Sequence, residues 1–361
     1  MSEEPPPSKR IRVNPVRIAL SGRSLAFFCL GVLAIIAFFY AFADVQEALS
    51  IISSADLLVY ALSFVSVTLG TLACTLAWHV LLCNAGMRIS LLREWKIIWV
   101  SVFVNIIIPT GSVSGEVTRI YLTLQSLADR DTKKSVGEVT STVLAHRVMT
   151  LVPFLLGSVA GFIYLSDAYK NSTVIVVLAS LLVVIFSAAF LGVCYLCASP
   201  STAEKVAKGL IELLHRLPVK SLRTRLDKAS ISIDENIGAF NRQIQTLFRD
   251  PRSLALASFF SVLFWVFDIF VAYFVFLSIG FPISFVALIF VYTIGTTIQM
   301  IPIGVPGMIG VVEVTMIALY TATGIPPAVG AAGTLLIRIV MLWFEALVGG
   351  FTTYLVVLRE K

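Results

Sequence analysis

The stretch IPIGVPGMIGVVEVT, residues 301–315, interrupts a long apolar region with prolines and glycines and ends near one carboxylate, Glu313. A second stretch, IPTGSVSGEVT at residues 108–118, has the same order, with Ile-Pro-x-Gly, a further glycine and then Glu-Val-Thr. Each is followed by a long apolar segment with one arginine near its middle. This ordered match predicts an internal repeat with one broken hairpin in each copy. The expected hairpin residues are Pro109, Gly111 and Gly115 in the first copy and Pro302, Gly304, Pro306, Gly307 and Gly310 in the second.

The composition is that of a membrane protein. Of the 361 residues, 58% are hydrophobic and 13% are charged, and the mean hydropathy is +0.94. Apolar runs of about 20 residues, the length that crosses a bilayer as a helix, recur along the chain. Backbone polar groups in hydrocarbon must bond within their own segment, and these runs are too continuous for the alternating strands of a barrel. The sequence therefore predicts an all-α fold, a polytopic membrane helix bundle.

Six full spans are expected from the apolar runs and their flanking charges. Lys and Arg gather in segments that belong on the cytoplasmic side, whereas residues 44–56 carry only acids among their charged groups, as suits an outer loop. The first apolar run exceeds the usual length in a signal peptide and is interpreted as a retained helix. Both termini are then cytoplasmic, the first as a disordered basic tail at residues 1–23. The expected spans are Ser24–Ala43, Leu57–Cys83, Val139–Leu165, Val174–Cys197, Leu254–Ile279 and Ala328–Leu358.

Two shorter apolar segments fit between these spans only as re-entrant hairpins. Residues 97–120 have basic segments on both sides, so this segment enters and leaves from the cytoplasm. Residues 285–322 begin and end on the outer side, because the last span must finish inside at Arg359 and Lys361. The two copies are therefore inverted. Many transporters are built from inverted repeats whose broken helices meet near the membrane midplane.

Residues 198–252 form the one extended polar region, between a first membrane half at 24–197 and a second at 253–361. Its many Lys and Arg residues place it in the cytoplasm. Apolar residues near helical spacing, for example Ile244 and Leu247, predict two amphipathic helices packed on the inner face. Two interpretations stay open: a solvated linker, or a basic face on anionic lipid headgroups, where each Lys or Arg contributes about 1 kcal/mol.

Charged residues inside the predicted spans are the candidate functional groups. A charge at the centre of a membrane helix costs roughly 2.5–3.5 kcal/mol on insertion scales, so these side chains should point inward. In one interpretation Arg147 and Arg338 form a polar pocket for an anionic headgroup, because a guanidinium can bind a phosphate through two parallel hydrogen bonds. The candidate substrate-binding residues are Arg147, Arg338, Glu116, Glu313, Arg119, His146, Asp268 and Glu345.

The alternative interpretation is structural, with the same charges holding helices together as ion pairs. A carboxylate beside a guanidinium compensates both charges in a poorly hydrated site. The expected pairs are Arg147 with Glu116 or Asp268, and Arg338 with Glu313 or Glu345.

Other site chemistries find no support in the sequence. The five cysteines are interpreted as small apolar residues. His79 and His215 have no suitable partners in sequence for a metal centre. The chain has no phosphate-binding P-loop and no nucleophile elbow. We therefore expect no cofactor, no metal and no nucleic-acid partner.

Several motifs, taken together, carry a resemblance to a known family. They are Pro109-x-Gly111 with Gly115-Glu116 and Arg119, Ala145-His146-Arg147, Pro302 with Pro306-Gly307 and Gly310-x-x-Glu313, and Arg338 in the last span. In these motifs the chain resembles the transmembrane (flippase) domain of the lysylphosphatidylglycerol synthases, a family that also includes stand-alone prokaryotic membrane proteins. The resemblance covers nearly the whole chain from Ser24 onward. The chain departs from it at Met308, where a second glycine often follows Pro-Gly, and this should stiffen the second hairpin.

The resemblance implies lipid transport and not lysyl transfer. The soluble domain that aminoacylates the lipid in these synthases is not expected in this chain, which argues against an enzyme. What remains is movement of a polar or anionic modified lipid between leaflets of the cell membrane, with anionic or glycosylated lipids as partners. Two alternatives stay open: a small-solute or ion transporter, and a membrane subunit that supports a separate lipid- or glycosyl-transferase. A transferase activity of this chain itself would need a donor-binding motif beside Glu116 or Glu313, and the sequence contains none.

Overall fold

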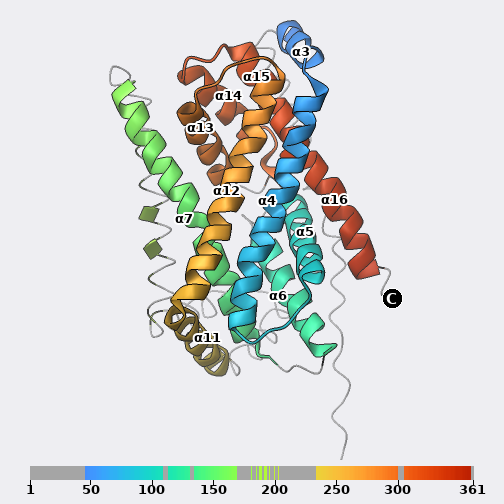
Figure 1. Ribbon diagram of the computed structural model, residues 1–361, viewed down its shortest axis with the longest axis vertical. Helices are drawn as coiled ribbons and strands as arrows, with labels where there is room; N and C mark the ends of the chain where they lie inside the picture. The colour runs from blue at the N-terminus through green and yellow to red at the C-terminus, as the bar shows by residue number, and fades with distance from the viewer. Residues whose placement is uncertain are drawn as a thin grey trace, which may run out of the picture.

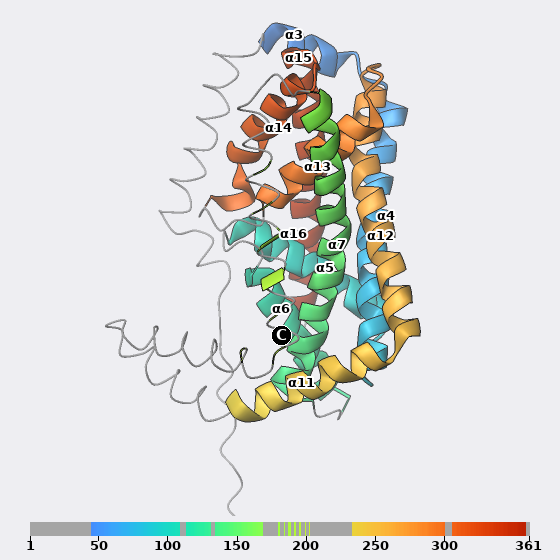
Figure 2. The same ribbon diagram turned by 90° about the vertical axis from the view of Figure 1, so that its left-hand side faces the viewer.

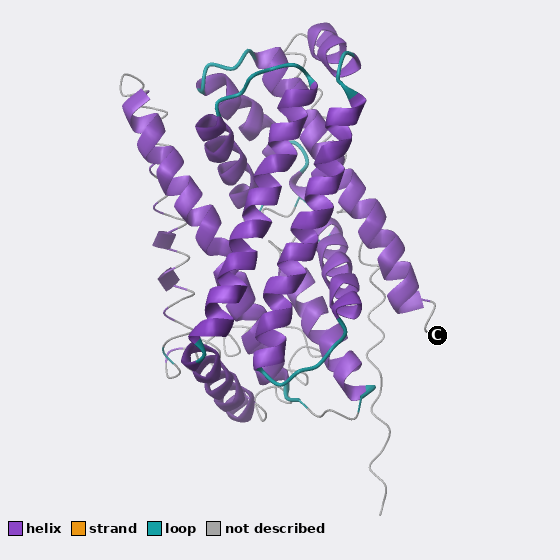
Figure 3. Cartoon of the chain, in the orientation of Figure 1, coloured by secondary structure: helices purple, strands orange, loops and turns teal. Residues whose placement is uncertain are grey.

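The computed structural model describes residues 45–108, 113–130, 134–168, 233–299 and 305–358, with isolated positions between 180 and 202. Every regular element in these ranges is helical, which confirms the all-α prediction (Figure 3). The elements in chain order are α3 (Val45–Ser53), α4 (Leu57–Asn84), α5 (Leu91–Ile107), α6 (Val113–Ala128), α7 (Val136–Ala168), α11 (Ile233–Arg249), α12 (Pro251–Ser278), α13 (Phe285–Ile298), the 3₁₀ turn η1 (Pro306–Met308), α14 (Val311–Ala322), α15 (Pro327–Arg338), the π segment η2 (Ile339–Phe344), α16 (Glu345–Thr353) and the π segment η3 (Tyr354–Leu358).

Four described helical stretches are long and apolar enough to cross a membrane, and they coincide with four of the six predicted spans. Their bounds are Leu57–Asn84, Val136–Ile163, Pro251–Ser278 and Pro327–Val356. The last of them runs continuously through α15, η2 and α16. The other two predicted spans, Ser24–Ala43 and Val174–Cys197, lie outside the described residues.

Helices α4 and α12 lie side by side along the full length of the bundle (Figure 1). At one end the backbone N–H of Asp56 donates to the Ser278 carbonyl at 2.8 Å, and at the other the Asn84 amide donates to the Asp250 carboxylate at 2.9 Å. Asp56 and Asp250 also cap the first turns of α4 and α12. Between these ends Gly70 lets the helices approach closely, because a Cβ there would lie 3.3 Å from that of Phe267.

The shorter helices occupy opposite halves of the bundle. Figure 2 shows α5 and α6 in its lower half and α13 and α14 in its upper half. At 1.5 Å per residue, even the 17-residue α5 extends about 26 Å, whereas the hydrocarbon core is about 30 Å thick. None of the four is long enough to be a span by itself. Among the expected hairpin residues, Pro109, Gly111, Pro302 and Gly304 lie outside the described residues, while Gly115, Pro306, Gly307 and Gly310 are described.

The last span packs tightly on α5. A Cβ built on Gly349 would lie 2.7 Å from the Trp99 carbonyl oxygen and 2.8 Å from the Cβ of Phe103, so only glycine fits at this crossing. Close approach through small residues is typical of helix packing in membranes, where lipid competes with every apolar contact. Through this contact the last span packs on α5, the short helix that precedes Glu116 in the chain.

Helix α11 lies across the lower end of the bundle, crossing below α7 and α12 (Figure 2). Its residues Ile244 and Leu247 are buried against Leu81 of α4 and Ala257 of α12, and its opposite face carries the exposed Arg242. This is the second of the two amphipathic helices predicted in residues 198–252. The first lies outside the described residues.

Candidate functional site

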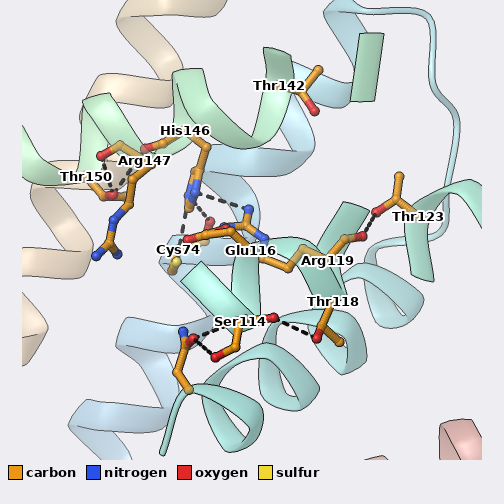
Figure 4. Close-up of polar contacts among 12 residues, drawn as sticks. Cys74, Ser114, Glu116, Thr118, Arg119, Thr123, Thr142, His146, Arg147 and Thr150 are labelled. Atoms are coloured by element: carbon orange, nitrogen blue, oxygen red, sulfur yellow. Dashed lines mark hydrogen bonds and ion pairs between the residues drawn. The ribbon is translucent and has the colours of Figure 1, made fainter. Parts of the chain in front are cut away.

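The Arg119 cluster consists of Arg119 and Glu116 of α6, His146 of α7 and Cys74 of α4 (Figure 4). Trp78 of α4 completes it. The guanidinium donates from Nη1 to the Glu116 carboxylate at 2.8 Å and from Nη2 to the His146 ring at 3.2 Å. It also lies 4.2 Å from the centre of the Trp78 ring, a cation–π contact. Arg119 is only 4% exposed, so these contacts replace water around its charge.

The hydrogen bonds of His146 define its tautomer. Its Nδ1 accepts from Arg119, which is possible only when that nitrogen carries no proton. Its Nε2 lies 3.0 Å from the Cys74 carbonyl oxygen and donates to it. His146 is therefore a neutral ring that joins α7 to α4 and α6, and it binds one terminal nitrogen of Arg119 while Glu116 binds the other.

The first turn of α6 is held by a side chain from α5. Asn105 accepts from the backbone N–H of Gly115 at 2.6 Å and from the Ser114 hydroxyl at 3.2 Å, which supplies a partner to the free end of the helix. A Cβ on Gly115 would lie 2.4–2.6 Å from the Asn105 amide group, so the glycine makes room for this cap. The cap places Glu116 and Arg119 on the face of α6 that turns toward α4 and α7.

The Arg338 cluster consists of Arg338 at the end of α15, Glu313 in the first turn of α14, Gly307 and Gly310. Arg338 donates from Nε to Glu313 at 2.6 Å and from Nη2 to the Gly307 carbonyl. The second oxygen of Glu313 accepts the backbone N–H of Gly310 at 2.6 Å. Both Arg338 and Glu313 are 3% exposed, which makes this the most deeply buried ion pair among the described residues.

The backbone before α14 takes a form that favours glycine. Gly307 and Gly310 have φ angles of +59° and +88°, in the region that side chains with a Cβ rarely adopt. Met308 is the one described non-glycine residue with positive φ, at +52°. This methionine therefore adopts a strained conformation that the surrounding packing must maintain. This turn presents the Gly307 carbonyl to Arg338.

Each of the two buried arginines has one guanidinium nitrogen that makes no hydrogen bond to the described residues. Within the described part of the chain, Nε of Arg119 and Nη1 of Arg338 are buried and have no hydrogen-bond partner. Buried donors are normally satisfied, and an unsatisfied one costs free energy. Each cluster therefore has a guanidinium that is compensated in charge and still has donor capacity for a further acceptor.

Asp268 and Glu345 are two further acids within the membrane spans, and neither belongs to the Arg119 cluster or the Arg338 cluster. Asp268, in the middle of α12, is 4% exposed, and Glu345 is the first residue of α16. Neither carboxylate makes a hydrogen bond or ion pair with the residues that the structure describes. Glu345 interacts electrostatically with Asp268 and Arg338, and Asp268 also interacts with the Cys74 thiol. The expected pairing of Arg338 is found with Glu313, and Glu345 remains without a direct cation.

Arg147 is placed differently from the expected ion pairs. It is partly buried on α7, and Figure 4 shows its guanidinium apart from Glu116 and Arg119, with no dashed line joining it to either. Glu116 pairs instead with Arg119, three residues further along the same helix. Within the described ranges, no ion pair joins Arg147 to Glu116 or Asp268.

A further pair, the partly exposed His79 with the buried Glu94, has no counterpart in the sequence analysis. The His79 Nδ1 lies 3.0 and 2.9 Å from the two oxygens of Glu94, whose side chain has no exposed surface. The turn at Gly86, with φ of +69°, folds α5 back beside α4 and brings the pair together. The available sequence signal was an acid in the first turn of α5. No group of three metal-binding side chains occurs among the described residues.

Replacing Glu313 with glutamine should reduce stability more than the same change at Glu116. Glu313→Gln leaves Arg338 buried without a counter-charge and is expected to cost about 1–3 kcal/mol. Glu116 is about one-fifth exposed, and Arg119 keeps its His146 and Trp78 contacts, so Glu116→Gln should cost less than about 1 kcal/mol. Thermal unfolding of both purified variants in one detergent measures the difference. Equal losses would show that burial does not distinguish the two pairs.

The fold and its buried charges define a class of protein: a multi-pass membrane helix bundle with ion-paired groups in its interior. The chain belongs to the lysylphosphatidylglycerol synthase TM region family, whose sequence model matches residues 18–349. It is similar to a UPF0104 membrane protein of Methanothermobacter thermautotrophicus, with 29% identity over 344 residues, 94% of this chain and 93% of that protein. It is also similar to UPF0104 membrane protein PH1989 of Pyrococcus horikoshii, with 23% identity over 312 residues, 85% and 90% of the two chains. The resemblance seen in the motifs is thereby confirmed.

Proposed function

We propose that this protein is a lipid translocase of the flippase type, which moves a polar or anionic modified lipid between the two leaflets. The observation that carries the proposal is the N–H donor on each buried arginine that has no partner among the described residues, namely Nε of Arg119 and Nη1 of Arg338. A phosphate is the acceptor that best matches a guanidinium in charge and geometry. Two such groups in one bundle offer a headgroup successive binding positions in place of the water it leaves.

The arrangement of short helices supports an inverted repeat with two re-entrant hairpins. Helices α5 and α6 lie in the half of the bundle opposite to α13 and α14 (Figure 2). In each half a carboxylate in the first turn of the second short helix, Glu116 or Glu313, binds a buried arginine. Broken helices at membrane depth are tolerated where they line a cavity in the protein. In the proposal, residues 24–197 and 253–361 are the two halves of the transporter.

The distribution of exposed charges supports an orientation with the lower end of the bundle in the cytoplasm. There the Arg130 side chain donates to the Arg88 carbonyl and Lys134 to the Ala85 carbonyl, beside the end of α4. The opposite end carries Asp56 at the start of α4. By the positive-inside rule the basic end is cytoplasmic, and both termini then lie there too.

Cysteine labelling should test this orientation. In a cysteine-free background, single cysteines at Ser54 and Thr323 are expected to react with an impermeant reagent from outside. Cysteines at Lys133 and Ser221 should react only after the membrane is permeabilised, so that the reagent reaches the cytoplasmic face. If Thr323 were accessible only from the cytoplasm, the second hairpin would not enter from outside and the inverted repeat would be lost.

Reconstitution tests the function itself. The full chain in liposomes, with fluorescent phosphatidylglycerol, an aminoacylated phosphatidylglycerol and a glycosylated lipid as probes, should move at least one of them between leaflets. Arg338→Lys keeps the charge but lacks the planar fork, so this variant should lose most of the rate. The matched control is Arg242→Lys on the exposed face of α11. Transport of none of these lipids, or full activity of the Arg338 variant, would contradict the proposal.

A small-solute or ion transporter is the second candidate, and Asp268 and Glu345 are the observation that favours it. Asp268 is buried and Glu345 is partly exposed, and two carboxylates without a direct cation are suited to a positively charged substrate. Uptake of labelled cations into the same liposomes separates the candidates, since a lipid translocase should not accumulate a soluble ion. A membrane subunit for a separate transferase would show neither activity alone.

A further inference from the structure

The charges inside the predicted membrane segments do not balance. Among Asp, Glu, Lys and Arg, these segments contain three arginines and four carboxylic acids. Two ion pairs, Arg119 with Glu116 and Arg338 with Glu313, account for two of each. The groups left over are Arg147, Asp268 and Glu345. If every group were ionised, the interior would carry one uncompensated negative charge.

The two remaining acids lie on elements that pack together. Val271, one helical turn beyond Asp268, forms a buried cluster with Val67 and Val340, and Phe344, the residue before Glu345, packs against that cluster. Glu345 interacts electrostatically with Asp268 and with Arg338, but the Arg338 guanidinium is already engaged by Glu313 and Gly307. The Tyr292 hydroxyl lies within electrostatic range of both acids; its side chain is 1% exposed, and the hydroxyl has no partner among the described residues. Asp268 faces α4, with one carboxylate oxygen 3.7 Å from the position of a Cβ on Gly70.

An isolated carboxylate in such a place is energetically unfavourable, and a proton is the simplest group that relieves it. Transferring an ionised carboxylate out of water without a partner costs far more than transferring the neutral acid. One proton shared by Asp268 and Glu345 would bring the charge of the membrane interior to zero.

We propose that Asp268 and Glu345 form a proton-binding site, and that its loading and release are coupled to lipid movement. The coupling rests on the proposed translocase function, whereas the proton site does not. On binding, the proton joins a carboxyl oxygen; on release it returns to water at either face. Because Glu345 also interacts electrostatically with Arg338, an anion that binds Arg338 would favour the protonated site. Its departure would favour release of the proton. The other titratable or charged groups around the site are Cys74 of α4, Glu116 and Arg119 of α6, His146 and Arg147 of α7, Tyr292 of α13, Glu313 and Tyr320 of α14 and Arg338 of α15.

Infrared spectroscopy of the purified full chain tests the proton site directly. At neutral pH the wild type should show the carbonyl stretch of a protonated carboxyl group, and Asp268→Asn and Glu345→Gln should each reduce or abolish it. Asp129→Asn, at an exposed acid beyond the end of α6, is the matched control and should leave the band unchanged. Absence of the band in the wild type, or its full retention in both variants, would overturn the proposal.

Proteoliposomes test the coupling. With fluorescent phosphatidylglycerol as the probe, a gradient of one pH unit should change the initial rate of the wild type by up to about tenfold, because such a gradient supplies about 1.4 kcal/mol. Asp268→Asn should transport at a rate that does not respond to the gradient. A wild-type rate that ignores the gradient would overturn the coupling and leave the translocase function standing. A protonated carboxyl band without transport of any lipid would instead overturn the function and leave the proton site standing.

Discussion

Replacing Arg338 with alanine should cost about 3–5 kcal/mol of folding free energy, the typical penalty for removing one partner of a buried ion pair. Glu313 would then be left 3% exposed with only the Gly310 N–H as a partner, and the Gly307 carbonyl would lose its donor. The turn before α14 depends on both contacts. We therefore expect Arg338→Ala to lower the yield of folded protein as well as its unfolding temperature in detergent.

The comparison with lysine separates recognition from stability. Arg338→Lys retains a cation for Glu313 and should keep the protein folded, yet an ammonium cannot bond Glu313 and the Gly307 carbonyl with the same planar geometry. Transport should therefore fall sharply while the unfolding temperature changes little. The control, Arg242→Ala, removes an exposed arginine from α11. If Arg338→Lys transported at the wild-type rate while Arg338→Ala failed to fold, Arg338 would be a purely structural residue.

The second large effect is expected at the crossing of α16 and α5. Gly349→Ala would place a methyl group 2.7 Å from the Trp99 carbonyl oxygen, which is backbone and cannot turn aside. At the neighbouring Gly350 the nearest atom is 3.1 Å away at the edge of the Phe103 ring, which can shift. Both changes bring the same helix-propensity gain of up to about 1 kcal/mol. The difference between the two variants thus isolates the clash, and we expect Gly349→Ala to be less stable by about 1–3 kcal/mol.

Unfolding temperatures of the two variants, measured side by side in one detergent, report this difference. Because α16 begins at Glu345, directly after η2, the displaced helix should also disturb Glu345, so Gly349→Ala is expected to slow lipid transport while Gly350→Ala does not. Identical stability of the two variants would mean that α16 and α5 do not approach each other as closely as described.

Much of the fold follows from local properties of the chain. The all-α class and four described spans were predictable because the length and hydropathy of a segment decide whether it can cross a bilayer, whatever its neighbours are. The family could be recognised for a similar reason, since its glycines, prolines and charges recur at fixed places in the chain. Glycine at 307 and 310 likewise matches the positive φ angles of the turn before α14.

The partners of the charged side chains were decided only by the tertiary structure. Arg338 does pair with Glu313, as one of two expected choices, but Glu116 pairs with Arg119 and not with Arg147. His79, which lacked a partner in sequence, binds Glu94. These contacts depend on how far each helix is rotated about its own axis when it packs. A rotation by one residue position is about 100°, which is enough to turn a side chain away from its partner and toward lipid. That rotation is set by packing between helices distant in sequence, through contacts such as Gly70 on Phe267 and Gly349 on Trp99, which no local pattern encodes.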